Sequence, residues 1–216
     1  MYKLYGYWRS TAAYRVRIAL NLKQVAYESI SIHLVKDGGE QHTEAYRTLN
    51  PQGLVPLLVS GNFQLSQSSA ILEYLEEQYP TPKLLPQEAQ SRALVRATCQ
   101  AIACDIHPLN NLRVLQYLSQ TLSVSDEAKN SWYQHWILRG FSALEASLSQ
   151  TSDHGEFCFG SQVSMADLYL IPQVYNANRF QVDLSDFPTI CSINDHCGKL
   201  TAFIDASPEH QPDAVK

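Results

Sequence analysis

The stretch that decides the fold is Tyr7-Trp8-Arg9-Ser10-Thr11-Ala12-Ala13-Tyr14-Arg15-Val16-Arg17-Ile18-Ala19-Leu20. The residues before it, 2–6 (YKLYG), mix aromatic and aliphatic side chains in a way typical of a β-strand. After Arg9 the apolar residues recur at helical spacing, which predicts a helix. Ser10 and Thr11 stand at the changeover, where an N-cap is expected and where free N–H groups and the helix dipole favour an anion. Either hydroxyl could stabilise a bound thiolate, although capping alone would account for both.

The residues that follow predict a small α/β domain. Five further elements are expected, in the order strand, helix, strand, strand, helix, at residues 26–32, 40–49, 55–59, 63–65 and 70–77. Gly61-Asn62 is typical of a two-residue hairpin turn, and a serine near residue 68 is available to cap the last helix. Together with the first strand and helix, this order predicts an α/β domain with a mixed sheet over residues 1–80.

The second half of the chain predicts only helices. A stiff proline-rich connection at residues 80–86 separates the two halves. Beyond it, helical patterns cover residues 88–122, 126–148 and 165–178, with shorter pieces from residue 188. We therefore expect an all-α second domain over residues 87–216. Ser164-Met165-Ala166-Asp167 has the form of a capping box, for which we expect a role in folding rather than in catalysis.

Composition excludes several classes of function. With 216 residues and a net charge of −5, the chain is not suited to binding a nucleic-acid backbone. No apolar run is long enough to cross a bilayer, and the N-terminus does not resemble a signal peptide. Five cysteines without a CxxC pair predict reduced, buried thiols in a cytoplasmic protein. Seven scattered histidines predict no metal site.

The opening stretch also carries a specific resemblance. Arg-Ser-x-x-x-x-Arg-Val-Arg-Ile-Ala-Leu resembles the zeta class of glutathione transferases, whose best-known members are maleylacetoacetate isomerases. Further matching landmarks extend the resemblance from Lys3 to about Asp213: Lys36-Asp37-Gly38-Gly39, Asn50-Pro51, Val55-Pro56, Gln67-Ser68, Asp105-Ile106-His107-Pro108, Met165-Ala166-Asp167-Leu168, Pro172-Gln173-Val174, Arg179-Phe180 and Val182-Asp183-Leu184. The resemblance implies a thioredoxin-like N-terminal domain that binds glutathione, an all-helical C-terminal domain that completes the substrate pocket, and a homodimer.

Residue roles follow from the resemblance, position by position. Ser10 matches the serine that faces the glutathione sulfur, and Thr11 falls where a second serine is common. The family's Val-Pro bond is cis, so Val55 would present its backbone to the tripeptide. Ser68, at a helix N-terminus, would take the γ-glutamyl carboxylate. The residues implied for glutathione binding are Ser10, Gln41, Val55, Gln67, Ser68, His107 and Asn111.

The implied reaction is a cis–trans isomerisation of a maleyl keto diacid. Glutathione thiolate would add to the cis double bond, the resulting single bond would rotate, and the thiolate would leave. The substrate's two carboxylates and its developing enolate require cations, for which Arg9, Arg113 and Arg179 are the candidates. Arg15 and Arg17 are assigned to structural roles, because the helix direction is expected to take them away from the N-terminus.

One departure from the family motif bears on activity. The fuller motif reads Ser-Ser-Cys, whereas this chain has Ser10-Thr11-Ala12. No cysteine nucleophile is therefore available at this position, and side activities that depend on its thiol are in doubt. Maleylacetoacetate is the favoured substrate, with maleylpyruvate next. A general or haloacid-converting glutathione transferase and a non-enzymatic glutathione-binding protein are the alternatives.

Overall fold

The computed structural model describes residues 1–150 and 155–215. The chain divides into two compact units. The first combines Met1–Lys83 with the residues from Gly198 onward, and the second is Leu84–Cys197. The helical domain expected over residues 87–216 therefore differs from the second unit, because its last segment packs with the N-terminal unit.

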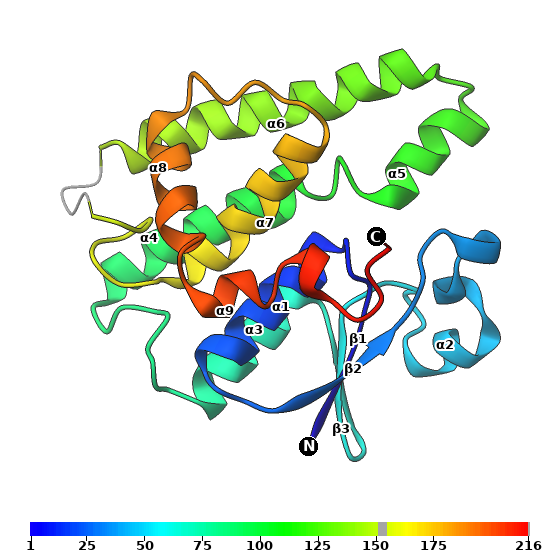
Figure 1. The fold of residues 1–216 in the computed structure, drawn as a ribbon, viewed down its shortest axis with the longest axis horizontal. Helices are drawn as coiled ribbons and strands as arrows, with labels where there is room; N and C mark the ends of the chain where they lie inside the picture. The colour runs from blue at the N-terminus through cyan, green and yellow to red at the C-terminus, as the bar shows by residue number, and fades with distance from the viewer. Residues whose placement is uncertain (151–154, 216) are drawn as a thin grey trace. The chain divides into compact units, whose positions relative to one another are not determined.

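The first unit is built on a four-stranded mixed sheet (Figure 1). Its strands are β1 (Tyr2–Gly6), β2 (Tyr27–Ser31), β3 (Leu57–Ser60) and β4 (Phe63–Ser66), in the order β2-β1-β3-β4. β1 runs parallel to β2 and antiparallel to β3, and β3 and β4 form the predicted hairpin around Gly61-Asn62. Leu4 and Leu58 are paired across β1 and β3 and are fully buried, so this face of the sheet is part of the core.

Helices cover this sheet and connect its strands. α1 (Thr11–Leu22) packs against α3 (Ser68–Gln78) and against the short α9 (Thr201–Ile204). α2 (Glu44–Leu49) follows two 3₁₀ turns, η1 (Lys36–Gly38) and η2 (Glu40–His42), and a third, η5 (Pro208–His210), follows α9. The predicted order of strands and helices is confirmed. The helix expected over residues 40–49 is divided at Thr43, whose hydroxyl caps α2 by accepting the Tyr46 N–H.

The second unit is helical. Its elements are α4 (Ala89–Gln100), the π-helix η3 (Ala101–Ile106), α5 (Leu112–Gln116), the π-helix η4 (Tyr117–Thr121), α6 (Asp126–Leu148), α7 (Met165–Arg179) and α8 (Pro188–Cys197). The continuous helix expected over residues 88–122 is wrong, because the chain leaves the helix between His107 and Asn111. Pro108 explains the break, since proline has no N–H and its ring clashes with the carbonyl four residues earlier.

The predicted capping box begins α7 and is buried. The Asp167 carboxylate accepts the Ser164 N–H at 2.7 Å, the Ser164 hydroxyl at 2.8 Å and the Cys158 N–H at 2.8 Å. Burial raises the pKa of Asp167, while these three bonds act in the opposite direction. The predicted capping box is therefore confirmed, and it joins the start of α7 to the segment before it.

The five cysteines are free, as predicted, but they are not all buried. Cys99, Cys158 and Cys197 are buried, Cys191 is half-buried and Cys104 is exposed. Burial raises the pKa of the Cys158 and Cys197 thiols, which makes them poor nucleophiles. No helix among the described residues is long and apolar enough to span a membrane.

Candidate active site

Ser10 ends the loop that joins β1 to α1 and is the N-cap of α1. Its backbone is extended, and its hydroxyl oxygen accepts the Ala13 N–H at 3.2 Å. A hydroxyl that accepts one hydrogen bond still has its own hydrogen to donate. Capping and thiolate stabilisation are therefore compatible, because the cap uses the oxygen and a thiolate would use the hydrogen.

Thr11 offers a less accessible hydroxyl. It is the first residue of α1 and is only 3% exposed, whereas Ser10 is half-buried. Of the two hydroxyls that the sequence left open, Ser10 is the better placed for a ligand.

The Arg9 side chain is held by its aromatic neighbours. One guanidinium nitrogen donates to the Tyr7 hydroxyl at 3.1 Å, and the guanidinium carbon lies 4.7 Å from the centre of the Trp8 ring. Such contacts restrict a long side chain without burying its charge. Arg9 thus presents a half-exposed cation one residue from Ser10, as an anchor for an anionic substrate requires.

The Arg17 side chain points back to the loop before α1, whereas the sequence predicted that it would point away from this loop. Its guanidinium donates to the carbonyls of Tyr7 at 3.4 Å, Trp8 at 3.0 Å and Ala206 at 2.8 Å. Its role is structural, as predicted, but the predicted direction is wrong. Side chains of a helix lean toward its N-terminus, so an arginine two turns into α1 can reach the preceding loop.

The N-terminus of α3 has the features of an anion site. The N-cap position is Gln67, which makes no capping hydrogen bond, so the expected serine cap is absent. Gln67 has a left-handed backbone with φ of 72°, which is costly for a residue other than glycine. Its side chain donates to the Gln52 Oε1 atom at 2.7 Å. The N–H groups of the first turn of α3 therefore lack a side-chain cap.

Arg15 brings a positive charge to this helix end, which the sequence analysis missed. It is 1% exposed, and its Nη1 atom lies 3.4 Å from the hydroxyl oxygen of Ser68, the first residue of α3. The sequence carries no local signal of this contact, because it depends on the packing of α1 against α3.

Gln41 and Val55 offer the polar groups that a peptide ligand needs. Gln41 is 5% exposed; its amide nitrogen donates to the Leu34 carbonyl at 3.1 Å, and its Oε1 atom has no partner among the described residues. Val55 precedes β3 and has the expected cis bond to Pro56. It makes no backbone hydrogen bond to another described residue. A buried amide oxygen without a partner is costly, so a ligand donor at this point would stabilise the loop.

Side chains of Tyr46 and Asn50 hold the loop before Val55 in place. The Leu54 carbonyl accepts the Tyr46 hydroxyl at 2.7 Å and the Asn50 amide at 2.8 Å. A tyrosine hydroxyl is protonated at neutral pH and can donate this bond, and burial raises the pKa of Tyr46 further, to about 12. The backbone that would face a peptide ligand is therefore held before the ligand binds.

The remaining candidates belong to the second unit. His107 is half-buried just after η3, and Asn111 caps α5 by accepting the Arg113 N–H at 3.2 Å. Arg113 is exposed. Arg179 is exposed at the end of α7, with its guanidinium 4.9 Å from the centre of the Phe180 ring. The Asn111 cap uses only the amide oxygen, which leaves its nitrogen able to donate to a ligand.

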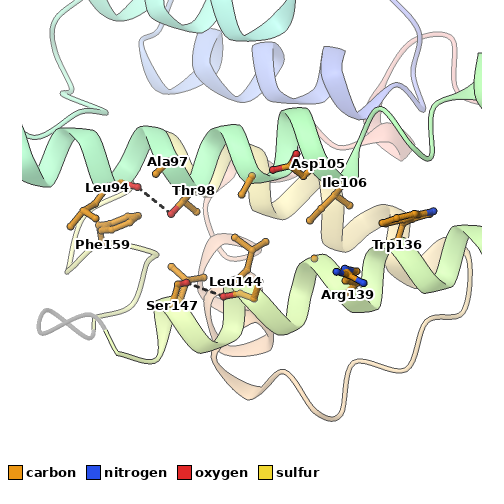
Figure 2. A pocket seen from close by; sticks show the side chains of 14 residues that line it. Leu94, Ala97, Thr98, Asp105, Ile106, Trp136, Arg139, Leu144, Ser147 and Phe159 are labelled. Carbon is orange, nitrogen blue, oxygen red and sulfur yellow. Dashed lines mark hydrogen bonds between the residues drawn. The ribbon is translucent and has the colours of Figure 1, made fainter.

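The second unit also contains an apolar cavity of about 490 Å³ between α4, η3 and α6 (Figure 2). Most of its lining is apolar, and Leu94 at one end is 59% exposed. Asp105 and Arg139 line it from η3 and α6 respectively. None of the predicted site residues lines this cavity, so it is separate from the groups described above.

Comparison with known proteins identifies the class of protein to which this fold belongs. Residues 4–83 match the model of the glutathione S-transferase N-terminal domain. A metal-binding cluster of three or more His, Cys, Asp or Glu side chains is absent among the residues that the structure describes. Backbone groups before β3, the uncapped start of α3 and the buried Gln41 amide fit a tripeptide thiol such as glutathione.

Known proteins that are similar to this chain over nearly its whole length identify its family. A probable maleylacetoacetate isomerase of Vibrio cholerae is 54% identical over 211 residues, covering 98% of this chain and 97% of that protein. A solved maleylpyruvate isomerase, a bacterial zeta-class glutathione transferase, has a TM-score of 0.96 and 49% identity, with 99% of this chain and 100% of that chain covered. The maleylacetoacetate isomerase of Methylobacterium extorquens AM1, solved with malonate and glutathione, has a TM-score of 0.95 and 41% identity over 99% of this chain and 100% of that chain. The chain belongs to the maleylacetoacetate isomerase family of zeta-class glutathione transferases.

Proposed function

We propose that this chain is a glutathione-dependent cis–trans isomerase that converts maleylacetoacetate to fumarylacetoacetate in tyrosine and phenylalanine catabolism. The observation that carries the proposal is the 54% identity, over 98% of the chain, to a probable maleylacetoacetate isomerase. Maleylpyruvate isomerisation in gentisate breakdown is the second candidate, because a maleylpyruvate isomerase of Ralstonia is 50% identical over 99% of this chain.

Ser10 has the central role in this proposal. When bound, glutathione supplies a thiolate that adds reversibly to the cis double bond and so permits rotation. Ser10 donates its hydroxyl hydrogen to that sulfur and lowers its pKa, with help from the N-terminal end of the α1 dipole. Gln41, Val55, Gln67 and Ser68 hold the tripeptide, and the Arg15 charge beside Ser68 favours a carboxylate there. His107 and Asn111 are proposed as further ligands of glutathione on the strength of the family resemblance.

Three arginines are proposed as anchors for the substrate's carboxylates and developing enolate. Arg9 is the strongest candidate, because it is half-exposed, restrained by Tyr7 and Trp8, and adjacent to Ser10. Arg113 and Arg179 are exposed guanidinium groups of the helical unit, which supports a role in binding an anion.

The first experiment is to measure turnover of maleylacetoacetate and maleylpyruvate side by side, with and without glutathione. We expect glutathione-dependent loss of the cis substrate, with maleylacetoacetate preferred. Preference for maleylpyruvate would assign the second candidate. No turnover of either, with glutathione still bound in a calorimetric titration, would favour a general transferase or a non-enzymatic glutathione-binding protein.

We further propose that the chain acts as a homodimer, in the cytoplasm. The location is supported by five free thiols, since reduced cysteines are typical of a reducing compartment. The dimer is supported by the apolar cavity between α4, η3 and α6 described above. We propose that a second copy of the chain covers it. Asp105 and Arg139, on its two walls, have opposite charges and form no ion pair with another described residue. In a dimer with two-fold symmetry, Asp105 of one copy would face Arg139 of the second copy, and the reverse pair would form as well.

Charge reversal tests this interface. Arg139→Asp is expected to raise the dissociation constant of the dimer about 30-fold or more, because two carboxylates would then face each other. Adding Asp105→Arg should restore the dimer with the charges exchanged. Analytical ultracentrifugation measures both effects. A wild-type monomer, or an Arg139→Asp dimer of unchanged affinity, would contradict this assignment of the surface.

A further inference from the structure

We propose that the C-terminal segment Gln211–Asp213 positions the loop that carries Arg9 and Ser10, with Asp213 as the positioning residue. No contact with a substrate is implied, because Asp213 acts through the backbone of Trp8. The inference rests on the proposed function only in supposing that this loop is catalytic.

Asp213 connects two segments that are distant in the sequence. Its Oδ2 atom accepts the Trp8 backbone N–H at 3.1 Å and the Ser31 hydroxyl at 2.9 Å. Figure 1 shows the C-terminal end of the chain beside the loop after β1. A carboxylate is a stronger acceptor for a backbone N–H than a neutral group. One oxygen thus fixes the loop after β1 to the end of β2.

Arg17 also holds Trp8, by a hydrogen bond to its backbone carbonyl. It donates to the Trp8 carbonyl at 3.0 Å and to the Ala206 carbonyl at 2.8 Å. Trp8 is therefore fixed at both its N–H and its carbonyl, one by the tail and one by α1. Since Arg9 stacks on the Trp8 ring and Ser10 is two residues later, a rotation at Trp8 would displace both groups.

The tail is itself anchored. The Gln211 side chain is 9% exposed and donates to the carbonyls of Asp205 and Ser207, both at 2.9 Å. Ala206, between them, accepts the bond from Arg17. A continuous set of hydrogen bonds therefore links α1, the turn after α9, the tail and the loop. Preorganisation of this kind matters because misplacement of a reacting group by about 1 Å can cost about 100-fold in rate.

Hydrogen exchange of the Trp8 amide tests the proposal without reference to activity. In Asp213→Ala we expect this amide to exchange at least about tenfold faster, because its acceptor is lost, while the amides of β1 and β3 keep their protection. Asp213→Asn retains an oxygen at the same place and should restore most of the protection. The matched control is Asp205→Ala, which removes an exposed carboxylate without a side-chain hydrogen bond to a described residue.

Function provides the second readout. Asp213→Ala is expected to lower kcat about tenfold with a smaller change in KM, and to raise the pKa of bound glutathione, followed by thiolate absorbance. Unchanged Trp8 exchange, or equal loss of protection throughout the sheet, would overturn the inference. If the wild-type chain lacked isomerase activity, the exchange result would still decide whether the tail holds the loop.

Discussion

Replacement of Ser10 by alanine is expected to lower kcat/KM for the glutathione-dependent isomerisation about 100- to 1,000-fold, as is typical when one preorganised donor is removed. The lost hydroxyl would have donated to the sulfur, so the pKa of bound glutathione should rise. Less thiolate would then be present at neutral pH, and activity should recover in part as the pH is raised. Steady-state kinetics and a pH titration of thiolate absorbance measure these effects.

Ser10→Ala also removes a helix cap, which costs about 1 kcal/mol of stability by itself. Ser125→Ala is the matched control, because Ser125 caps α6 by the same bond, to the Ala128 N–H at 3.2 Å. This variant should lose comparable stability and retain activity. Thr11→Val, which keeps the shape of a nearly buried side chain, should retain most activity. Full turnover in both Ser10→Ala and the Ser10→Ala/Thr11→Val double variant would refute hydroxyl activation of the thiolate.

Replacement of Asp167 by alanine is expected to lower the free energy of unfolding by about 3–5 kcal/mol, because it leaves buried donors without their acceptor. The donors are the N–H groups of Cys158 and Ser164 and the Ser164 hydroxyl. Asp167 is fully buried, so these donors are shielded from bulk water. Urea denaturation followed by circular dichroism measures the change.

Two comparisons isolate this effect. Asp167→Asn keeps one acceptor oxygen and should lose less stability than the alanine variant. Asp183→Ala removes an exposed carboxylate that accepts the Ser185 N–H at 2.9 Å, and it should leave the denaturation midpoint almost unchanged. An Asp167→Ala protein as stable as Asp183→Ala would show that the capping box contributes little to folding.

The order of elements could be predicted because local patterns determine it. Alternation in residues 26–32, the Gly61-Asn62 turn and the helical spacing after Arg9 are each visible within a few residues. The division of residues 88–122 was missed, although Pro108 was present, because the apolar pattern continues on both sides of the proline. At this point the local effect of proline, which lacks an N–H, outweighs the helical periodicity of its neighbours.

The candidate site was less predictable where long side chains are involved. Arg17 meets the Ala206 carbonyl, 189 residues later in the chain, and Asp213 meets the Trp8 N–H, 205 residues earlier. No periodicity indicates such partners, because they depend on how the two ends of the chain meet. Arg15 near Ser68 is of the same kind. The roles proposed for Ser10, Gln41 and Val55, by contrast, are implied by a family resemblance that extends over nearly the whole chain.

The first unit contains residues from both ends of the chain, which has a consequence for its synthesis. A ribosome makes the sheet and α1 first, then the whole helical unit, and only then the residues from Gly198 onward. Until Ala206 and Asp213 emerge from the exit tunnel, Arg17 and the Trp8 N–H lack the acceptors that these residues provide. The loop around Ser10 therefore gains these two contacts only after the whole helical unit has been synthesised.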